Sequence, residues 1–175
     1  MNLLRSGLTS IFLLISFYLS NAAEIRKSIS LNNEWKTVAD DFDKEKYNDF
    51  NQASFNDKDW KQVNVPHNWD KYEGYRRLLH GNRHGYAWYR KTFKIEDQPN
   101  TNKKYFLFFE GVGSYATVWL NGKQVGYHAG GRTTFTLDIS KEILLNNQEN
   151  ILAVRADHPA EIRDLPWVDG GCSSE

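Results

Sequence analysis

The sequence has no second cysteine and no net charge, and each of these absences excludes a class of protein. Cys172 cannot form a disulfide within the chain, so the domain is stabilised by core packing rather than by a disulfide framework. Basic and acidic side chains number 22 each, so the formal net charge is zero. Because the chain has no excess of positive charge to attract a polyanion, we expect no nucleic-acid partner.

Spacings typical of metal and cofactor sites are also missing. The five histidines show no ligand spacing typical of a structural zinc site, and the lone cysteine adds no partner to them. Gly126, Gly130 and Gly131 do not follow a strand into a helix with the spacing of a dinucleotide-binding loop. The sequence therefore predicts neither a metal nor a cofactor.

The N-terminal segment predicts export. Arg5 precedes an apolar run from Leu8 to Leu19, and the small residues at 20–23 form a cleavage site typical of a secretory signal peptide. The run is about a dozen residues long, whereas a membrane-spanning helix needs about 20. We expect residues 1–22 to be removed and the mature chain, 23–175, to be secreted or periplasmic, with no membrane anchor.

The mature chain is rich in aromatic residues and in short segments with strand-like alternation. With 40% hydrophobic and 14% aromatic residues in 175, it can bury one good core. Little helical pattern is present, and turn residues recur at roughly 8 to 12 residue spacing, which is typical of an all-β sandwich or jelly roll. The predicted strands are 28–31, 60–65, 86–95, 104–110, 133–139 and 151–157, with a hairpin over 115–131.

The strongest local signal is the hairpin. Asn121-Gly122 lies between two alternating segments, and a type I′ turn requires positive φ at both of these positions. The segment 104–110 is apolar on both faces, so we predict that it lies centrally in its sheet.

Two long segments are predicted to be loops. Residues 40–59 are polar with scattered aromatics, which predicts a surface loop or an irregular helix held by Tyr47, Phe50 and Phe55. Residues 71–85 are basic and show no apolar period. A loop of this length within a compact domain is uncommon unless it is functional or disordered, and we favour a function.

Several of these segments carry a family resemblance. In this order along the chain, they resemble the N-terminal sugar-binding domain of glycoside hydrolase family 2, which includes β-galactosidases, β-glucuronidases and β-mannosidases. The segments are Val65–Trp69 with the letters VPHNW, Gly85–Phe93, Phe109–Val112, Val118–Gly122 and Asn150–Arg155.

The resemblance implies an architecture. The expected fold is a jelly-roll β-sandwich, galactose-binding-domain-like, which precedes an immunoglobulin-like domain and a TIM barrel. Family members use two glutamates for retaining hydrolysis, and both belong to the barrel, which takes about 250 residues by itself. The family's last strand of this domain follows a segment like 164–175, so the resemblance implies a sandwich that is incomplete at its C-terminal end. No catalytic residue is expected here, and the chain alone should be inactive.

The resemblance also implies a substrate-binding residue. In the β-galactosidase branch an asparagine three positions before a strand-opening glycine reaches the sugar pocket, and counting back from Gly85 gives Asn82. A carboxamide both donates to and accepts from sugar hydroxyls. The alternative is that Asn82 caps a turn beside Gly81. His84 is a second candidate that could bind a sugar hydroxyl, or it could simply be an exposed loop histidine.

The expected function is therefore that of the N-terminal domain of an exported family 2 glycoside hydrolase. It would brace the catalytic barrel and lend a loop to the sugar pocket, with a carbohydrate substrate and the C-terminal domains as its partners. Two alternatives stay open. The chain could act as a stand-alone carbohydrate-binding module, which requires exposed aromatic side chains, or as a purely structural domain.

Overall fold

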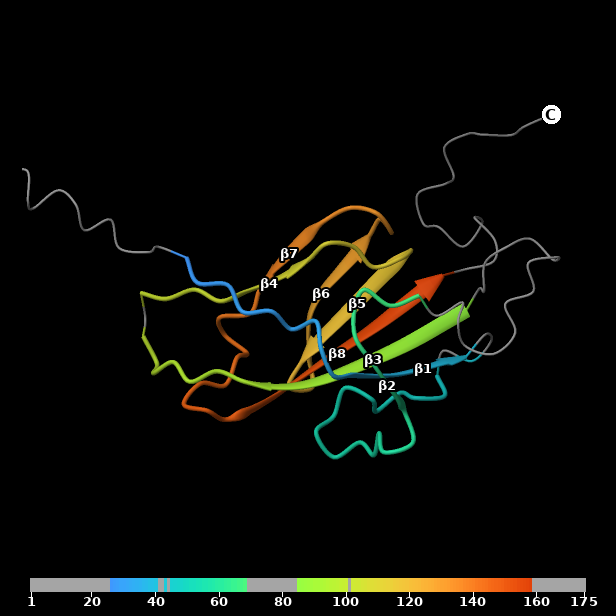
Figure 1. Cartoon of the computed structure of the whole chain (residues 1–175), viewed down its shortest axis with the longest axis horizontal. Coiled ribbons are helices and arrows are strands. Elements are labelled where there is room, and N and C mark those ends of the chain that lie inside the picture. Colours follow the sequence, from blue (N-terminus) through green and yellow to red (C-terminus); the bar gives the residue numbers. More distant parts are fainter. Residues whose placement is uncertain (1–25, 41–42, 44, 69–84, 101, 159–175) are drawn as a thin grey trace, which may run out of the picture. The chain divides into compact units, whose positions relative to one another are not determined.

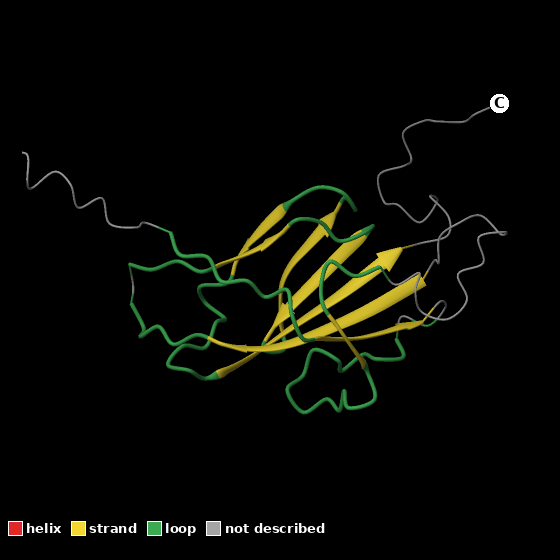
Figure 2. Ribbon diagram, viewed as in Figure 1, coloured by secondary structure: helices red, strands yellow, loops and turns green. Residues whose placement is uncertain are grey.

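The computed structural model describes residues 26–40, 43, 45–68, 85–100 and 102–158. Asn82 and His84 lie outside the described residues. The chain divides into two units, Met1–Ser30 and Leu31–Glu175, and residues 26–30 of the first contain no strand. Everything below concerns the described residues of the second unit, whose regular structure consists of strands (Figure 2).

The strands form two antiparallel sheets (Figure 1). The large sheet has six strands in the order β2-β1-β3-β8-β5-β6, and the small sheet pairs β4 with β7. In chain order the strands are β1 Trp35–Asp40, β2 Lys61–Val63, β3 Gly85–Lys94, β4 Phe106–Phe109, β5 Tyr115–Leu120, β6 Lys123–Ala129, β7 Phe135–Asp138 and β8 Glu149–His158.

The main hydrophobic core lies between the two sheets. Val118 and Leu152 of the large sheet are fully buried and belong to one cluster with Leu107 and Phe135 of the small sheet. Gly126 in β6 permits this close approach, because a Cβ there would overlap the side chain of Leu137 in β7. Burial of these apolar faces confirms the predicted all-β sandwich.

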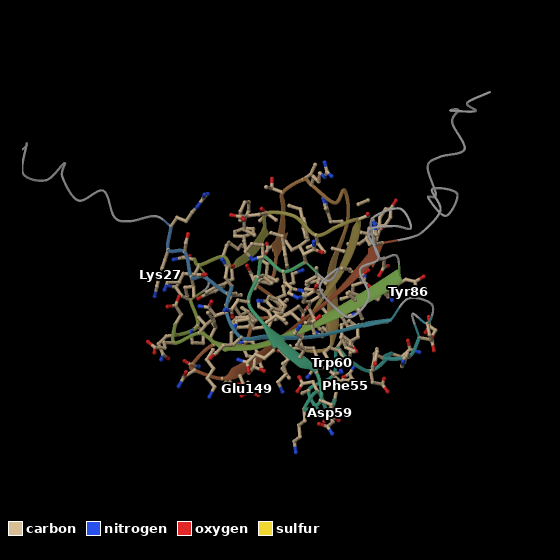
Figure 3. The ribbon with its side chains drawn as sticks, turned by 45° about the vertical axis from the view of Figure 1, so that its right-hand side comes forward. Lys27, Phe55, Asp59, Trp60, Tyr86 and Glu149 are labelled. Atoms are coloured by element: carbon tan, nitrogen blue, oxygen red, sulfur yellow. The ribbon has the colours of Figure 1, made fainter. Side chains whose placement is uncertain are left out.

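A second, aromatic core covers part of the opposite face of the large sheet. Trp88 of β3 is 1% exposed and packs beneath the loop that precedes β2. The Tyr47 ring meets Trp88 edge-on at 4.9 Å, and Phe50 meets Trp119 at 5.1 Å, which are favourable aromatic geometries. Phe55 and Trp60 belong to the same cluster (Figure 3). The prediction that aromatic side chains hold this loop is confirmed.

A buried arginine fastens the same loop to the sheet. Arg90 of β3 is 4% exposed, and its Nε donates to Asp57 Oδ2 at 2.8 Å. Its Nη1 donates to the carbonyls of Phe50 and Gln52. Lys36 Nζ donates to the other Asp57 oxygen at 2.7 Å. Because the guanidinium is buried, these partners are required to offset its lost hydration.

The hairpin forms as predicted. Asn121 has φ of 52° and Gly122 has φ of 85°, so both turn positions are left-handed. The Asn121 side chain also accepts from the amide of Ile151 and donates to the Glu142 carbonyl, which ties the turn to the start of β8.

Two strand predictions are wrong. Residues 28–31 form no strand, and β1 begins only at Trp35, after Glu34 interrupts the extended backbone with φ of 57°. Segment 104–110 is not central, because β4 has one neighbour among the described strands, β7. Its alternation turns Leu107 into the core and leaves Phe106 and Phe108 57% and 65% exposed.

We expect Asp57→Asn to reduce the free energy of unfolding by about 2 kcal/mol, because it leaves the buried Arg90 guanidinium without its counter-charge. Chemical denaturation at neutral pH measures this loss. Glu142→Gln is the control, since it removes a pair whose lysine, Lys123, is 70% exposed, and it should cost less than about 0.5 kcal/mol. Equal losses in the two variants would contradict the role given to Arg90.

The same pair predicts how stability depends on pH. Burial alone would raise the pKa of Asp57, but the hydrogen bonds and charges of Lys36 and Arg90 outweigh it and hold that pKa below its ordinary value of 3.8. Its contribution is therefore complete above that value and is lost as the pH falls below it. The stability difference between the natural protein and Asp57→Asn should therefore shrink in denaturation series as the pH falls below about 4. A constant difference would contradict this linkage.

Candidate functional site

The end of the large sheet where β3 begins is the described region that follows the predicted site residues directly in the sequence. Gly85 pairs with His158, and Asp157 lies opposite both Tyr86 and Tyr115. Three adjacent strands, β3, β8 and β5, thus place Tyr86, Asp157 and Tyr115 in one row across the sheet. In the sequence, Asn82 and His84 come three residues and one residue before Gly85, the first residue of β3.

Arg155 and Asp157 form a side-chain pair on the face of the sheet at this row, which we call the arginine clamp. Arg155 donates from Nε to Asp157 Oδ1 at 2.8 Å and from Nη2 to Oδ2 at 3.1 Å, a bidentate pair along one strand. Its guanidinium lies 5.9 Å from the centre of the Tyr86 ring and 6.0 Å from that of Trp119. The carboxylate and the two rings therefore fix the guanidinium in one orientation.

A serine–histidine contact fastens the start of β5 to the end of β8. Ser114 Oγ lies 2.7 Å from His158 Nδ1, and the Ser114 amide donates to the Asp157 carbonyl at 3.0 Å. A nucleophilic serine needs a base that an acid orients, together with an oxyanion site. Here the Asp157 carboxylate accepts from Arg155 instead. The contacts of Ser114 with His158 and Asp157 therefore join the start of β5 to the end of β8.

Two tyrosines extend the aromatic surface onto β6. The rings of Tyr115 and Tyr127 are parallel to within 8°, with centroids 6.4 Å apart, and Tyr127 is 51% exposed. Partial burial, with smaller effects of Tyr115 and Asp157, raises the pKa of Tyr127 above its ordinary value of 10.0. Its hydroxyl is therefore protonated at neutral pH and can donate a hydrogen bond.

This sheet end can orient a polar, hydroxyl-rich ligand or support a loop that does. It combines aromatic faces, a fixed guanidinium and the neutral phenol of Tyr127, which are groups that contact sugars without reacting with them. Within the described ranges, no three histidine, cysteine or acidic side chains gather to hold a metal ion. In the same ranges, no helix is long and apolar enough to cross a membrane.

The residues predicted for the site and those found at this sheet end differ. Asn82 and His84 lie outside the described residues, so their roles stay predictions. Sequence reasoning missed Arg155, Asp157 and the Ser114–His158 contact. The alternation of 151–157 already places Arg155 and Asp157 on one face, and that signal could have identified the pair, although not the rings around it.

Comparison with known proteins gives one family. The model for glycosyl hydrolases family 2, sugar binding domain, matches residues 28–172. A β-galactosidase from Thermoanaerobacter pseudethanolicus is 35% identical over 143 residues, which are 81% of this chain and 18% of that protein. A β-glucuronidase from Bacteroides fragilis is 28% identical over 94% of this chain and 21% of its own length. The chain thus spans about a fifth of the length of these curated relatives.

Solved structures agree with the sequence relatives. A β-glycosidase from Bacteroides vulgatus superposes with a TM-score of 0.62 at 31% identity, covering 76% of this chain and 17% of that one. A Bacteroides uniformis β-glucuronidase also gives 0.62, at 28% identity over 78% of this chain and 16% of its own. The β-sandwich, the match over 28–172 and these relatives show that the chain belongs to glycoside hydrolase family 2 and carries its N-terminal sugar-binding domain.

Proposed function

We propose that this chain is the N-terminal domain of an exported family 2 glycoside hydrolase of the β-galactosidase type, acting on O-glycosidic bonds in carbohydrate metabolism. The domain braces a catalytic TIM barrel and lends the loop 71–85 to its sugar pocket. Residues 1–22 direct the protein to the periplasm or the exterior. The two catalytic glutamates lie in the barrel, so this domain contributes binding rather than chemistry.

The observation that carries this proposal is the rigid start of β3. Gly85 is held by the register with His158, and the Arg155–Asp157 clamp and the Ser114–His158 contact fix the strands beside it. Asn82 lies three residues before Gly85, and three residues of chain span at most about 11 Å. A short attachment to a rigid sheet limits where the carboxamide can move, as positioning a substrate requires.

The chemistry expected of Asn82 is hydrogen bonding to sugar hydroxyls. Its carboxamide donates and accepts without a change of charge, so it can hold a hydroxyl in both the ground state and the transition state. His84 would add a second contact from the same loop. Arg76, Arg77 and Arg83 of this loop could bind a carboxylated sugar through their planar donors, which makes a glucuronide the competing substrate.

We expect Asn82→Ala in the full-length enzyme to lower kcat/KM about tenfold on its preferred glycoside, because a buried sugar hydroxyl loses its partner. Galactoside and glucuronide substrates should be assayed in parallel. Asn48→Ala is the matched control, since Asn48 is exposed on the loop before β2, and it should leave kcat/KM unchanged. An unchanged kcat/KM for Asn82→Ala on both substrates would favour a purely structural domain.

One observation favours a second candidate function, that of a stand-alone carbohydrate-binding module. Tyr127 is half exposed beside the parallel ring of Tyr115, and a flat ring can stack on the apolar face of a pyranose. The fixed guanidinium of Arg155 lies on the same face of the sheet.

If the chain binds glycans alone, its migration should slow in gels that contain a soluble polysaccharide. Tyr127→Ala should abolish that retardation, whereas Tyr127→Phe should retain most of it because the ring is kept. Retardation that persists in Tyr127→Ala would exclude this surface, and no retardation of the natural chain would exclude the module.

A further inference from the structure

The hairpin turn between β5 and β6 contains the one Asn-Gly pair of the sequence, Asn121-Gly122. Asparagine before glycine is the pair most open to deamidation, because glycine has no side chain to shield its amide nitrogen. In this reaction the Gly122 nitrogen bonds to Asn121 Cγ, and Asn121 Nδ2 leaves as ammonia with the proton of the Gly122 amide. Water then opens the cyclic imide to an aspartate or an isoaspartate. The reaction needs no enzyme and no reactant except water.

The folded domain engages both polar atoms of the Asn121 side chain. Its Oδ1 accepts from the Ile151 amide at 2.9 Å. Its Nδ2 donates to the Glu142 carbonyl at 2.8 Å and to Asn150 Oδ1 at 3.0 Å, which uses both of the hydrogens that it carries. Ring closure moves Cγ and expels Nδ2, so it requires these hydrogen bonds to break.

The backbone of the turn is held from two sides as well. The Asn121 amide donates to the Ile151 carbonyl at 2.9 Å, which fixes the turn to β8. Asn51, in the loop before β2, donates from its side chain to the Gly122 carbonyl at 3.0 Å. Because both residues of the pair are fixed, attack by the Gly122 nitrogen requires the turn to open, and the population of the open state then limits the reaction rate.

The surroundings of Asn121 suit an amide and not a carboxylate. Asn150 is fully buried, and Leu144 orients its carboxamide: the Leu144 amide donates to Oδ1 and the Leu144 carbonyl accepts from Nδ2, each at 2.7 Å. Asn150 therefore cannot turn an N–H toward Asn121 without losing both of these bonds. An aspartate at position 121 would place an oxygen against the Asn150 oxygen and the Glu142 carbonyl, with no hydrogen to share.

We propose that Asn121 is a deamidation site that the folded domain keeps closed and that opening of the β5–β6 turn exposes. Once formed, the carboxylate opposes closure of the same turn, because it lacks the donor hydrogens of the carboxamide. An isoaspartate would also lengthen the backbone of a two-residue turn and disturb the pairing of Leu120 with Lys123. A transient opening is thereby converted into a lasting loss of stability. The inference is independent of the glycosidase proposal, because it needs neither the loop 71–85 nor a ligand.

The first test compares the reaction in the folded and the denatured chain. The purified chain is incubated in mildly alkaline buffer with and without guanidinium chloride, and peptide mass spectrometry follows the deamidated fraction at Asn121. We expect the folded chain to react at least about a hundredfold more slowly, because the open turn is a minor state. Equal rates in the two conditions, or no reaction in the denatured chain, would overturn the proposal.

Two variants of the loop before β2 test whether the turn itself controls the reaction. Asn51→Ala removes the donor to the Gly122 carbonyl, so deamidation of the folded chain should become about threefold to tenfold faster. Asn48→Ala is the matched control, because Asn48 is an exposed asparagine of the same loop, and it should leave the rate unchanged. An Asn51→Ala rate no higher than that of Asn48→Ala would contradict control by the turn.

The last test measures what the product does to the fold. Asn121→Asp introduces the carboxylate without the reaction, and it should lower the folding equilibrium constant at least about tenfold in chemical denaturation at neutral pH. Asn147→Asp is the matched control, since Asn147 is also left-handed, with φ of 59°, but is exposed. It should change that constant less than about twofold. If Asn121→Asp proved as stable as Asn147→Asp, the lasting loss of stability would be refuted.

Discussion

The ladder between β3 and β8 is the constraint on which the rest of the structure depends. Its register runs from Gly85 with His158 to Lys94 with Glu149, and it forms the middle of the large sheet. Both of its faces are covered. Tyr89 and Val154 face the core shared with the small sheet, whereas Trp88 and Ala153 face the aromatic cluster. A slip of one residue would exchange these faces, so the two cores hold the register between them.

Two arginines perform related tasks on the aromatic side of this ladder. Arg90 is buried near its middle, where it binds Asp57 and two loop carbonyls and so holds the covering loop on the sheet. Arg155 lies near its end, where its guanidinium donates to Asp157 and contacts the rings of Tyr86 and Trp119. Planar guanidinium groups suit both places, because they donate in fixed directions and stack on rings. One arginine therefore stabilises the fold, and the other stiffens the sheet end that bears the proposed functional loop.

The sequence predicted best those features that short segments determine. Asn121-Gly122 specified its hairpin because a type I′ turn depends on two residues. The position of β4 was mispredicted because apolar residues on both faces do not say how many neighbours a strand has. The Arg155–Asp157 clamp was missed because its surroundings, Tyr86 and Trp119, come together only through the registers of β8 with β3 and β5. Asn82 rests on the family resemblance and His84 on its place in the same loop, and both remain predictions.

The central claim is that this domain works as the first part of a larger exported hydrolase. The measurement that tests it most directly is the intact mass and N-terminal sequence of the mature protein from its native source. The account predicts a mass several times the 20.4 kDa of this chain, with an N-terminus that lacks residues 1–22. A mature protein slightly lighter than 20.4 kDa would contradict the account, because the sandwich would then act without a catalytic barrel.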